Sequence, residues 1–253
     1  MTDTSDQLAR LLSIMATLRD PEIGCEWDRA QRFETIVPHT IEEAYEVADA
    51  VSRGDIAEIR DELGDLLFQV VFQARIAEES GQFDFEDVAR SIADKLVARH
   101  PHVFGNEPAP GGERDARWEA IKAAERGAKG ANSAMDGVAL ALPALMRAQK
   151  LQKRAARQGF DWPDRSGAEG KIAEEIEELR AASSDELLEE CGDFLFAAVN
   201  LVRAYGVDAE DALRHGNAKF ERRYRAMEAR APDFASLSLD EQEAHWQAVK
   251  SSE

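Results

Sequence analysis

The sequence repeats one acidic helical motif, and this internal duplication restricts the possible folds more than any other feature. In the first half, Thr40-Ile-Glu-Glu-Ala-Tyr-Glu46 precedes Glu62-Leu-Gly-Asp-Leu-Leu-Phe68. In the second half, Ile172-Ala-Glu-Glu-Ile-Glu-Glu178 precedes Glu190-Cys-Gly-Asp-Phe-Leu-Phe196. Because the motifs recur in the same order, we predict two related domains, residues 1–130 and 131–253, separated by the Gly- and Ser-containing stretch 127–133.

Both halves show the apolar period of α-helices. Apolar residues recur every three or four positions, as in Leu188, Cys191, Leu195 and Val199. This spacing places them on one helix face, whereas the alternation typical of strands is nearly absent. We therefore predict an all-α fold of about nine helices. One of them spans Phe85–Arg99, and the two acidic helices of the second copy pack antiparallel across the turn 181–184.

The carboxylates of each copy are spaced so that they can converge. Glu175 and Glu178 are three residues apart on one predicted helix, and Glu190 and Asp193 are three apart on the next. Residues three or four apart share a helix face, so an antiparallel helix pair would bring these four carboxylates together. The matching residues of the first copy are Glu43, Glu46, Glu62 and Asp65.

A carboxylate cluster of this kind favours a hard divalent cation, because neighbouring carboxylates repel one another unless a cation neutralises them. Oxygen ligands suit Mg²⁺, with Mn²⁺ as a second possibility, and no predicted ligand is the His or Cys that zinc prefers. Gly64 and Gly192 interrupt the same helices at a cost of roughly 1 kcal/mol each, which we interpret as close helix packing beside the metal. Two simpler alternatives are a solvated acidic face and, in the first copy, a capping box formed by Thr40 and Glu43.

Basic residues four apart form candidate phosphate contacts. Lys219 and Arg223 share a predicted helix face, where they can hold phosphate oxygens, although surface salt bridges would explain the same spacing. The first copy repeats this spacing at Lys95 and Arg99. Trp118 and Trp246 are candidates for stacking on a base, but packing in a core is the commoner role of tryptophan.

Charge and cysteine content restrict the partners and the compartment. The sequence has 31 Lys and Arg against 50 Asp and Glu, a net charge of −19 that argues against binding nucleic-acid polymers. Cys25 and Cys191 lie far apart and indicate neither a disulfide framework nor a zinc site. The N-terminal residues lack a basic start followed by an apolar run, and no long apolar segment occurs, so we expect a cytoplasmic protein without membrane attachment.

Further motifs accompany the acidic pairs in a fixed order. Around the first pair stand Arg19-Asp-Pro-Glu-Ile-Gly-Cys-Glu-Trp-Asp28 and Lys95-Leu-Val-Ala-Arg-His-Pro-His-Val-Phe104. Around the second stand Leu142-Pro-Ala-Leu-Met-Arg-Ala-Gln-Lys150, Gly159-Phe-Asp-Trp162 and Lys219-Phe-Glu-Arg-Arg223. Together they resemble the MazG family of nucleoside triphosphate pyrophosphohydrolases over nearly the whole chain. One departure is Glu26, where that family more often has proline, and we expect only a loop effect.

The resemblance implies tandem four-helix modules, a homodimer, and Mg²⁺-dependent conversion of nucleoside triphosphates to monophosphates and pyrophosphate. It implies Mg²⁺ ligation by Glu175, Glu178, Glu190 and Asp193. It implies nucleotide contacts from Lys171, Glu174, Glu189, Lys219, Arg223 and Trp246. Glu174 and Glu175 are then the catalytic candidates, with Glu174 orienting the attacking water.

Two other classes of protein compete with this reading. A di-iron or di-manganese carboxylate bundle requires Glu-x-x-His on two helices, which neither motif region contains. An acidic helical interaction module without catalysis remains the alternative, although it would not require the matched basic pairs. If the chain is an enzyme, we predict that the second copy carries the dominant site, because its Lys171 corresponds to His39, which is mostly neutral at pH 7.

Overall fold

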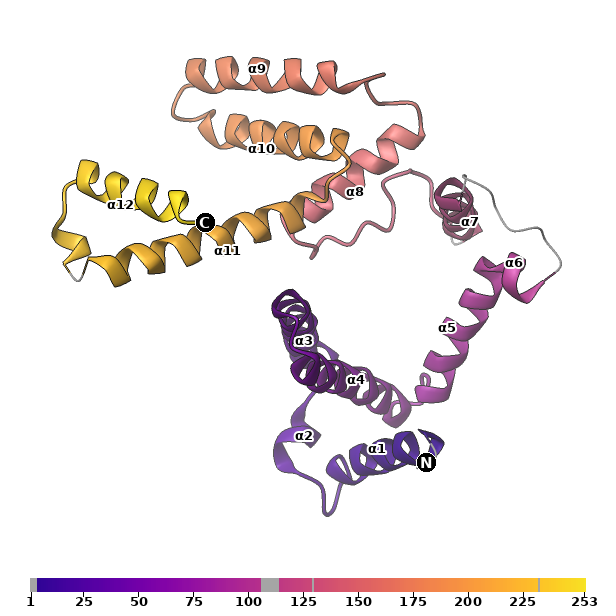
Figure 1. Ribbon diagram of the computed structural model, residues 1–253. Helices are drawn as coiled ribbons and strands as arrows, with labels where there is room; N and C mark the ends of the chain where they lie inside the picture. The colour runs from indigo at the N-terminus through magenta and orange to yellow at the C-terminus, as the bar shows by residue number, and fades with distance from the viewer. Residues whose placement is uncertain (1–3, 106–113, 129, 232) are drawn as a thin grey trace. The chain divides into compact units, whose positions relative to one another are not determined.

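The computed structural model describes residues 4–105, 114–128, 130–231 and 233–253, and these residues form helices without any strand (Figure 1). The chain divides into two compact units, residues 1–118 and 119–253, and each is described by itself. The all-α prediction and the tandem arrangement are confirmed. The domain boundary after Gly130 stays a prediction, and Lys129 of the expected separating stretch lies outside the described residues.

The described residues contain twelve α-helices and one short 3-10 helix, where about nine helices were predicted from the apolar period. Helices α2 and α6 have only five and four residues, which is too short for an apolar period to show. The first six helices are α1 (Thr4–Leu18), α2 (Glu26–Ala30), α3 (Phe33–Arg53), α4 (Ile56–Glu79), α5 (Phe85–Arg99) and α6 (Pro101–Phe104). The others are α7 (Arg114–Ala128), α8 (Ala144–Arg157), α9 (Arg165–Ala181), α10 (Leu187–Ala204), α11 (Ala209–Arg230), η1 (Phe234–Ser236) and α12 (Leu239–Ser251).

In the first unit, α3 and α4 form a helical hairpin against which α1 packs. Gly54 ends α3 with φ of 73°, a left-handed conformation that glycine adopts without steric cost. Asp55 then begins α4, because its carboxylate accepts hydrogen bonds from the backbone N–H groups of Ala57 and Glu58. Apolar side chains of α1, α3 and α4 make the core, which contains Met15, Ile36, Val71 and Phe72. The hairpin is therefore fixed by a short turn and by a packed apolar face.

In the second unit, α9 and α10 form the equivalent hairpin, and α8 packs against α10 as α1 packs against α4. Asp164 begins α9 by accepting a hydrogen bond from the backbone N–H of Ser166. The predicted pairing of the two acidic helices is confirmed, and so is the helix Phe85–Arg99 in the first unit. After α10, helices α11 and α12 form a second hairpin around Met227, Phe234 and Val249.

Among the residues that the structure describes, no helix combines the length and the apolar character required to cross a bilayer.

Candidate functional site

Three predicted carboxylates of the second unit converge between α9 and α10. Glu175 comes from α9, and Glu190 and Asp193 come from the first two turns of α10. One carboxylate oxygen from each residue lies within 4.8 Å of the others. Glu175 is only 3% exposed, so its charge is held in a largely dehydrated position. Since buried charges are stable only when paired or bound to a metal, this group needs a cation.

Lys171 supplies a positive charge at one side of this cluster. Its Nζ lies 2.8 Å from Oε1 of Glu174 and 2.8 Å from Oε1 of Glu175. The same Nζ lies 3.8 Å from Oε2 of Glu178, so that fourth predicted carboxylate also borders the cluster. Hydrogen bonds to Glu174 and Glu175 raise the pKa of Lys171, because they stabilise the charged ammonium group.

The cluster still carries more negative charge than this one lysine balances. Burial raises the pKa of Glu190, and repulsion from Glu178, Asp193 and Glu175 raises it further. In addition, Oε2 of Glu175 is buried without a hydrogen-bond partner in the part of the chain that the structure describes. An oxygen-only cluster with an unsatisfied buried oxygen has the ligand chemistry that Mg²⁺ or Mn²⁺ prefers.

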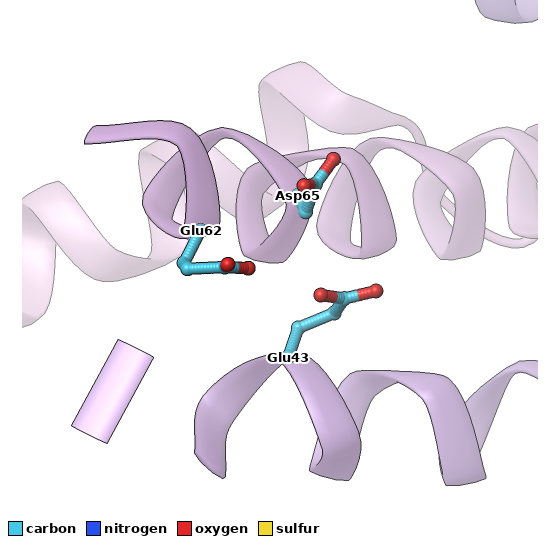
Figure 2. A group of neighbouring side chains, drawn as sticks. All are labelled: Glu43, Glu62 and Asp65. Atoms are coloured by element: carbon cyan, nitrogen blue, oxygen red, sulfur yellow. The ribbon is translucent and has the colours of Figure 1, made fainter. Parts of the chain in front are cut away.

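The first unit repeats the arrangement with Glu43 on α3 and Glu62 and Asp65 on α4, and one carboxylate oxygen of each lies within 4.8 Å of the others. Figure 2 shows Glu43 and Glu62 extending into the space between the two helices. Burial is the main factor that raises the pKa values of Glu43 and Glu62, and repulsion from neighbouring carboxylates adds to it. Glu46 contributes to the repulsion that raises the pKa values of both glutamates, so the fourth predicted residue also lies near this cluster. The two copies thus place corresponding acids in corresponding positions.

Two expectations about these helices are wrong. Thr40 lies inside α3 and not at the start of this helix. Its Oγ1 donates to the carbonyl oxygen of Ile36, one turn earlier, at 3.1 Å. A capping box with Glu43 is therefore impossible, because a cap must precede the helix. Gly64 and Gly192 do not mark close packing within a unit, because a Cβ atom added at either would meet no atom within 4 Å. Both glycines lie on exposed faces of their helices.

The other predicted nucleotide contacts gather at the second hairpin, α11–α12. Lys219 and Arg223 lie one turn apart on α11, and the Arg223 guanidinium is 5.3 Å from the centre of the Trp246 ring. Nη2 of Arg223 is also 2.5 Å from Oε2 of Glu253, and Trp246 packs against the core of this hairpin. No contact among the described residues joins this group to the carboxylates. The first unit shows the same pairing of Arg99 over Trp118, at 5.2 Å.

Glu189 and Glu174 are more exposed than Glu175. Glu189 is exposed on α10 and contributes to the electrostatic repulsion that raises the pKa of Glu190. Glu174 has an exposed side chain whose only described partner at the cluster is Lys171. Both residues therefore border the acid cluster from the solvent side, where a bound ligand can reach them.

Sequence reasoning missed a cavity of about 710 Å³ that borders this cluster. Glu175, Asp193 and Lys171 lie at its edge, and its wall is mainly apolar, with Leu151, Phe160, Trp162 and Phe196 among the lining residues. The sequence signal that could have indicated this cavity was the replacement of Phe72 in the first copy by Asn200 in the second. That difference could be interpreted only once the packing around both residues was known.

Comparison with known proteins gives a consistent result. Residues 31–104 match the family model described as MazG nucleotide pyrophosphohydrolase domain, and residues 143–219 match that of phosphoribosyl-ATP pyrophosphohydrolase. A protein of Escherichia coli K12 named nucleoside triphosphate pyrophosphohydrolase is 51% identical over 98% of both chains. A Thermotoga maritima protein named nucleoside triphosphate pyrophosphohydrolase/pyrophosphatase MazG is 44% identical over 95% of this chain and 94% of its own length. The chain therefore belongs to the MazG family of nucleotide pyrophosphohydrolases.

Proposed function

We propose that this chain is an Mg²⁺-dependent hydrolase that converts nucleoside triphosphates to nucleoside monophosphates and pyrophosphate. The observation that carries the proposal is the convergence of Glu175, Glu190 and Asp193 beside Lys171. The names of the similar Escherichia coli and Thermotoga maritima proteins support the substrate class and the pyrophosphohydrolase activity.

The carboxylates would hold the metal. Glu175, Glu190 and Asp193 form the group with the closest oxygens, and Glu178 borders it. Mn²⁺ is the second candidate, since it accepts the same oxygen ligands. A bound divalent cation would neutralise phosphate charge and lower the pKa of a coordinated water. The chain's own contribution is to hold these ligands on two packed helices, so that they are preorganised before substrate arrives.

The remaining side chains are assigned by their charge and position. Lys171, Lys219 and Arg223 would contact phosphate oxygens, with Glu189 and Trp246 as further nucleotide contacts. Glu174 would orient the attacking water through its exposed carboxylate. The water oxygen then bonds to the α-phosphorus while the bond from that phosphorus to the bridging oxygen breaks, and pyrophosphate leaves. Glu174 and Glu175 are accordingly the candidates for catalytic residues.

We also propose that the second copy carries the dominant site. Lys171 bonds two carboxylates there, whereas the matching His39 lies 3.5 Å from Glu42 in the first copy. An imidazole offers a triphosphate a weaker contact than an ammonium group does, because a histidine is not permanently charged. The first-copy acids Glu43, Glu46, Glu62 and Asp65 would still bind a metal. Domain 131–253 would then carry most of the catalysis, and domain 1–130 would contribute mainly to the dimer scaffold.

A homodimer would explain the exposed glycines. Leu188, Gly192 and Leu195 recur at helical spacing on α10, and the two leucines are 87% and 55% exposed. Residues at this spacing share a face, so the glycine lies within an apolar strip that a second copy could cover closely. On α4, Leu63, Leu67 and Val70 form another apolar strip of exposed residues. A cytoplasmic location, expected from the sequence, remains a prediction.

The test is to incubate the purified chain with each nucleoside triphosphate, with Mg²⁺ or with a chelator, and to separate the products. Monophosphate and pyrophosphate should form only when the metal is present. A diphosphate as the major product would contradict the proposed bond cleavage. No turnover of any nucleoside triphosphate would instead favour the alternative of an acidic interaction module.

A further inference from the structure

The cavity beside Glu175 is large, mostly apolar and close to the acid cluster. Its volume of about 710 Å³ is within the usual range of small-molecule sites, roughly 300 to 1,000 Å³. Lys171, Glu175 and Asp193 belong both to its lining and to the charged cluster. A ligand with a flat apolar part and a charged part could therefore place the flat part in the cavity and the charge at the cluster.

In the first unit, a protein side chain fills the position that matches this part of the cavity. Phe72 in α4 corresponds to Asn200 in α10, counted from the aligned Glu62 and Glu190 without any gap. Phe72 is fully buried and packs with Met15, Ile36 and Val71, with the Trp27 ring 6.4 Å away. An aromatic ring thus occupies the position in the first copy where the second copy has an amide.

Asn200 is held so that its donor is left for a ligand. It is 9% exposed and lines the cavity. Asp161 fixes Arg203 through contacts of 2.7 and 2.9 Å, and Nε of Arg203 donates to Oδ1 of Asn200 at 2.9 Å. Both side-chain hydrogen bonds of Asn200 in the described part of the chain use Oδ1 as acceptor, so its Nδ2 group remains available. A ligand in the cavity can supply an acceptor for this amide group.

Besides Phe196, two aromatic side chains from the connection between α8 and α9 line the same cavity. Gly159 ends α8 with φ of 84°, and the chain then places Phe160, which is 83% exposed, in the cavity lining. Trp162 lies against Gly167 of α9 so closely that a Cβ atom there would come within 2.2 Å of the indole ring. Exposed aromatic rings around a polar donor are suited to stacking on a heterocycle.

We propose that this cavity is the nucleobase site of the second unit, in which Phe160 and Trp162 contact the ring faces and Nδ2 of Asn200 donates to a carbonyl or ring-nitrogen acceptor of the base. The proposal rests on the proposed function, since it takes a nucleoside triphosphate as the ligand. It makes Asn200 a specificity-determining residue, and it explains why the first copy, with Phe72, would bind a base poorly at the matching position.

Equilibrium titrations with Mg²⁺ and an α,β-methylene nucleoside triphosphate test the proposal without turnover. Asn200→Phe, which copies the first unit, should weaken binding at least about tenfold, because it fills the cavity and removes the donor. Inorganic tripolyphosphate, which has no base, should bind this variant within about twofold of the unmodified chain. Unchanged nucleotide binding would overturn the proposal, and so would an equal loss for both ligands.

A second variant avoids any change in the buried core. Phe160→Ala should weaken nucleotide binding by about fivefold or more through lost stacking. Leu140→Ala is the matched control, because Leu140 is also 83% exposed but does not line the cavity. Equal affinities for the two variants would contradict the assignment. Hydrolysis by the unmodified chain is measured separately, so failure of the base site and failure of the proposed function give different results.

Discussion

Nζ of Lys171 lies 2.8 Å from Oε1 of Glu175, one turn further along α9. The ammonium group therefore neutralises part of the same charge that a divalent cation would neutralise. At the matching place in the first unit, Nδ1 of His39 lies 3.5 Å from Oε2 of Glu42. This difference between the two copies leads to the first prediction.

Lys171→Met should tighten Mg²⁺ binding to the second unit when nucleotide is absent. Because Mg²⁺ carries two charges, removing a unit positive charge about 4 Å from the solvated ion corresponds to roughly thirtyfold in affinity. The same variant should raise KM for nucleoside triphosphate, because it loses a phosphate contact. Calorimetric titration of Mg²⁺ measures the first effect, with His39→Met as the control in the other copy. Weaker Mg²⁺ binding by Lys171→Met would show that the lysine supports the metal site instead of competing with it.

The double variant Glu175→Gln/Glu178→Gln should lose most Mg²⁺-dependent turnover, by more than about tenfold. Glu43→Gln/Glu46→Gln should lose much less, because the second copy is proposed to carry the dominant site. Both variants should keep the helical circular dichroism signal, since neutral amides relieve repulsion between carboxylates. Turnover is compared at subsaturating substrate. Equal losses would mean that the copies are equivalent or coupled.

Leu188→Glu should dissociate the proposed homodimer. The leucine is 87% exposed, so a charge there costs nothing in a monomer but would have to be dehydrated in an interface. Sedimentation velocity of the unmodified chain and the variant measures the change in mass. Leu239→Glu is the control, because Leu239 is also largely exposed but lies on α12, away from the proposed strip. A monomeric unmodified chain would remove the basis for this proposal.

The ion pair of Asp161 and Arg203 should make the stability of the second unit depend on pH. Hydrogen bonds from Arg203 lower the pKa of Asp161 below its ordinary value, although burial opposes this effect. The stabilisation is therefore present above the ordinary pKa of aspartate, about 3.9, and is lost as the pH falls through the lower pKa of the folded state. Urea unfolding of the unmodified chain and of Asp161→Asn should show a free-energy difference that shrinks as the pH falls from about 5 to about 2.5. A difference that stays constant over this range would contradict the assignment.

The sequence by itself determined the helical class, the duplication and the carboxylates that converge. Those features depend on short-range spacing, because residues three or four apart share a helix face whatever the rest of the chain does. It also predicted the pairing of Glu175 with Glu190 and Asp193, since a short turn between two helices leaves little choice but an antiparallel hairpin. The roles of these residues in metal binding and catalysis remain proposals.

Only the tertiary structure decided what surrounds the carboxylates. Thr40 and Glu43 have the spacing of a capping box, yet the helix begins at Phe33, so its start depended on contacts that the local pattern does not contain. Asn200 lies within an apolar run, and nothing in that run shows that its position, filled by Phe72 in the other copy, borders a cavity. Cavities and ion pairs such as that of Asp161 with Arg203, 42 residues apart, arise where distant segments meet, and spacing along one helix does not encode them.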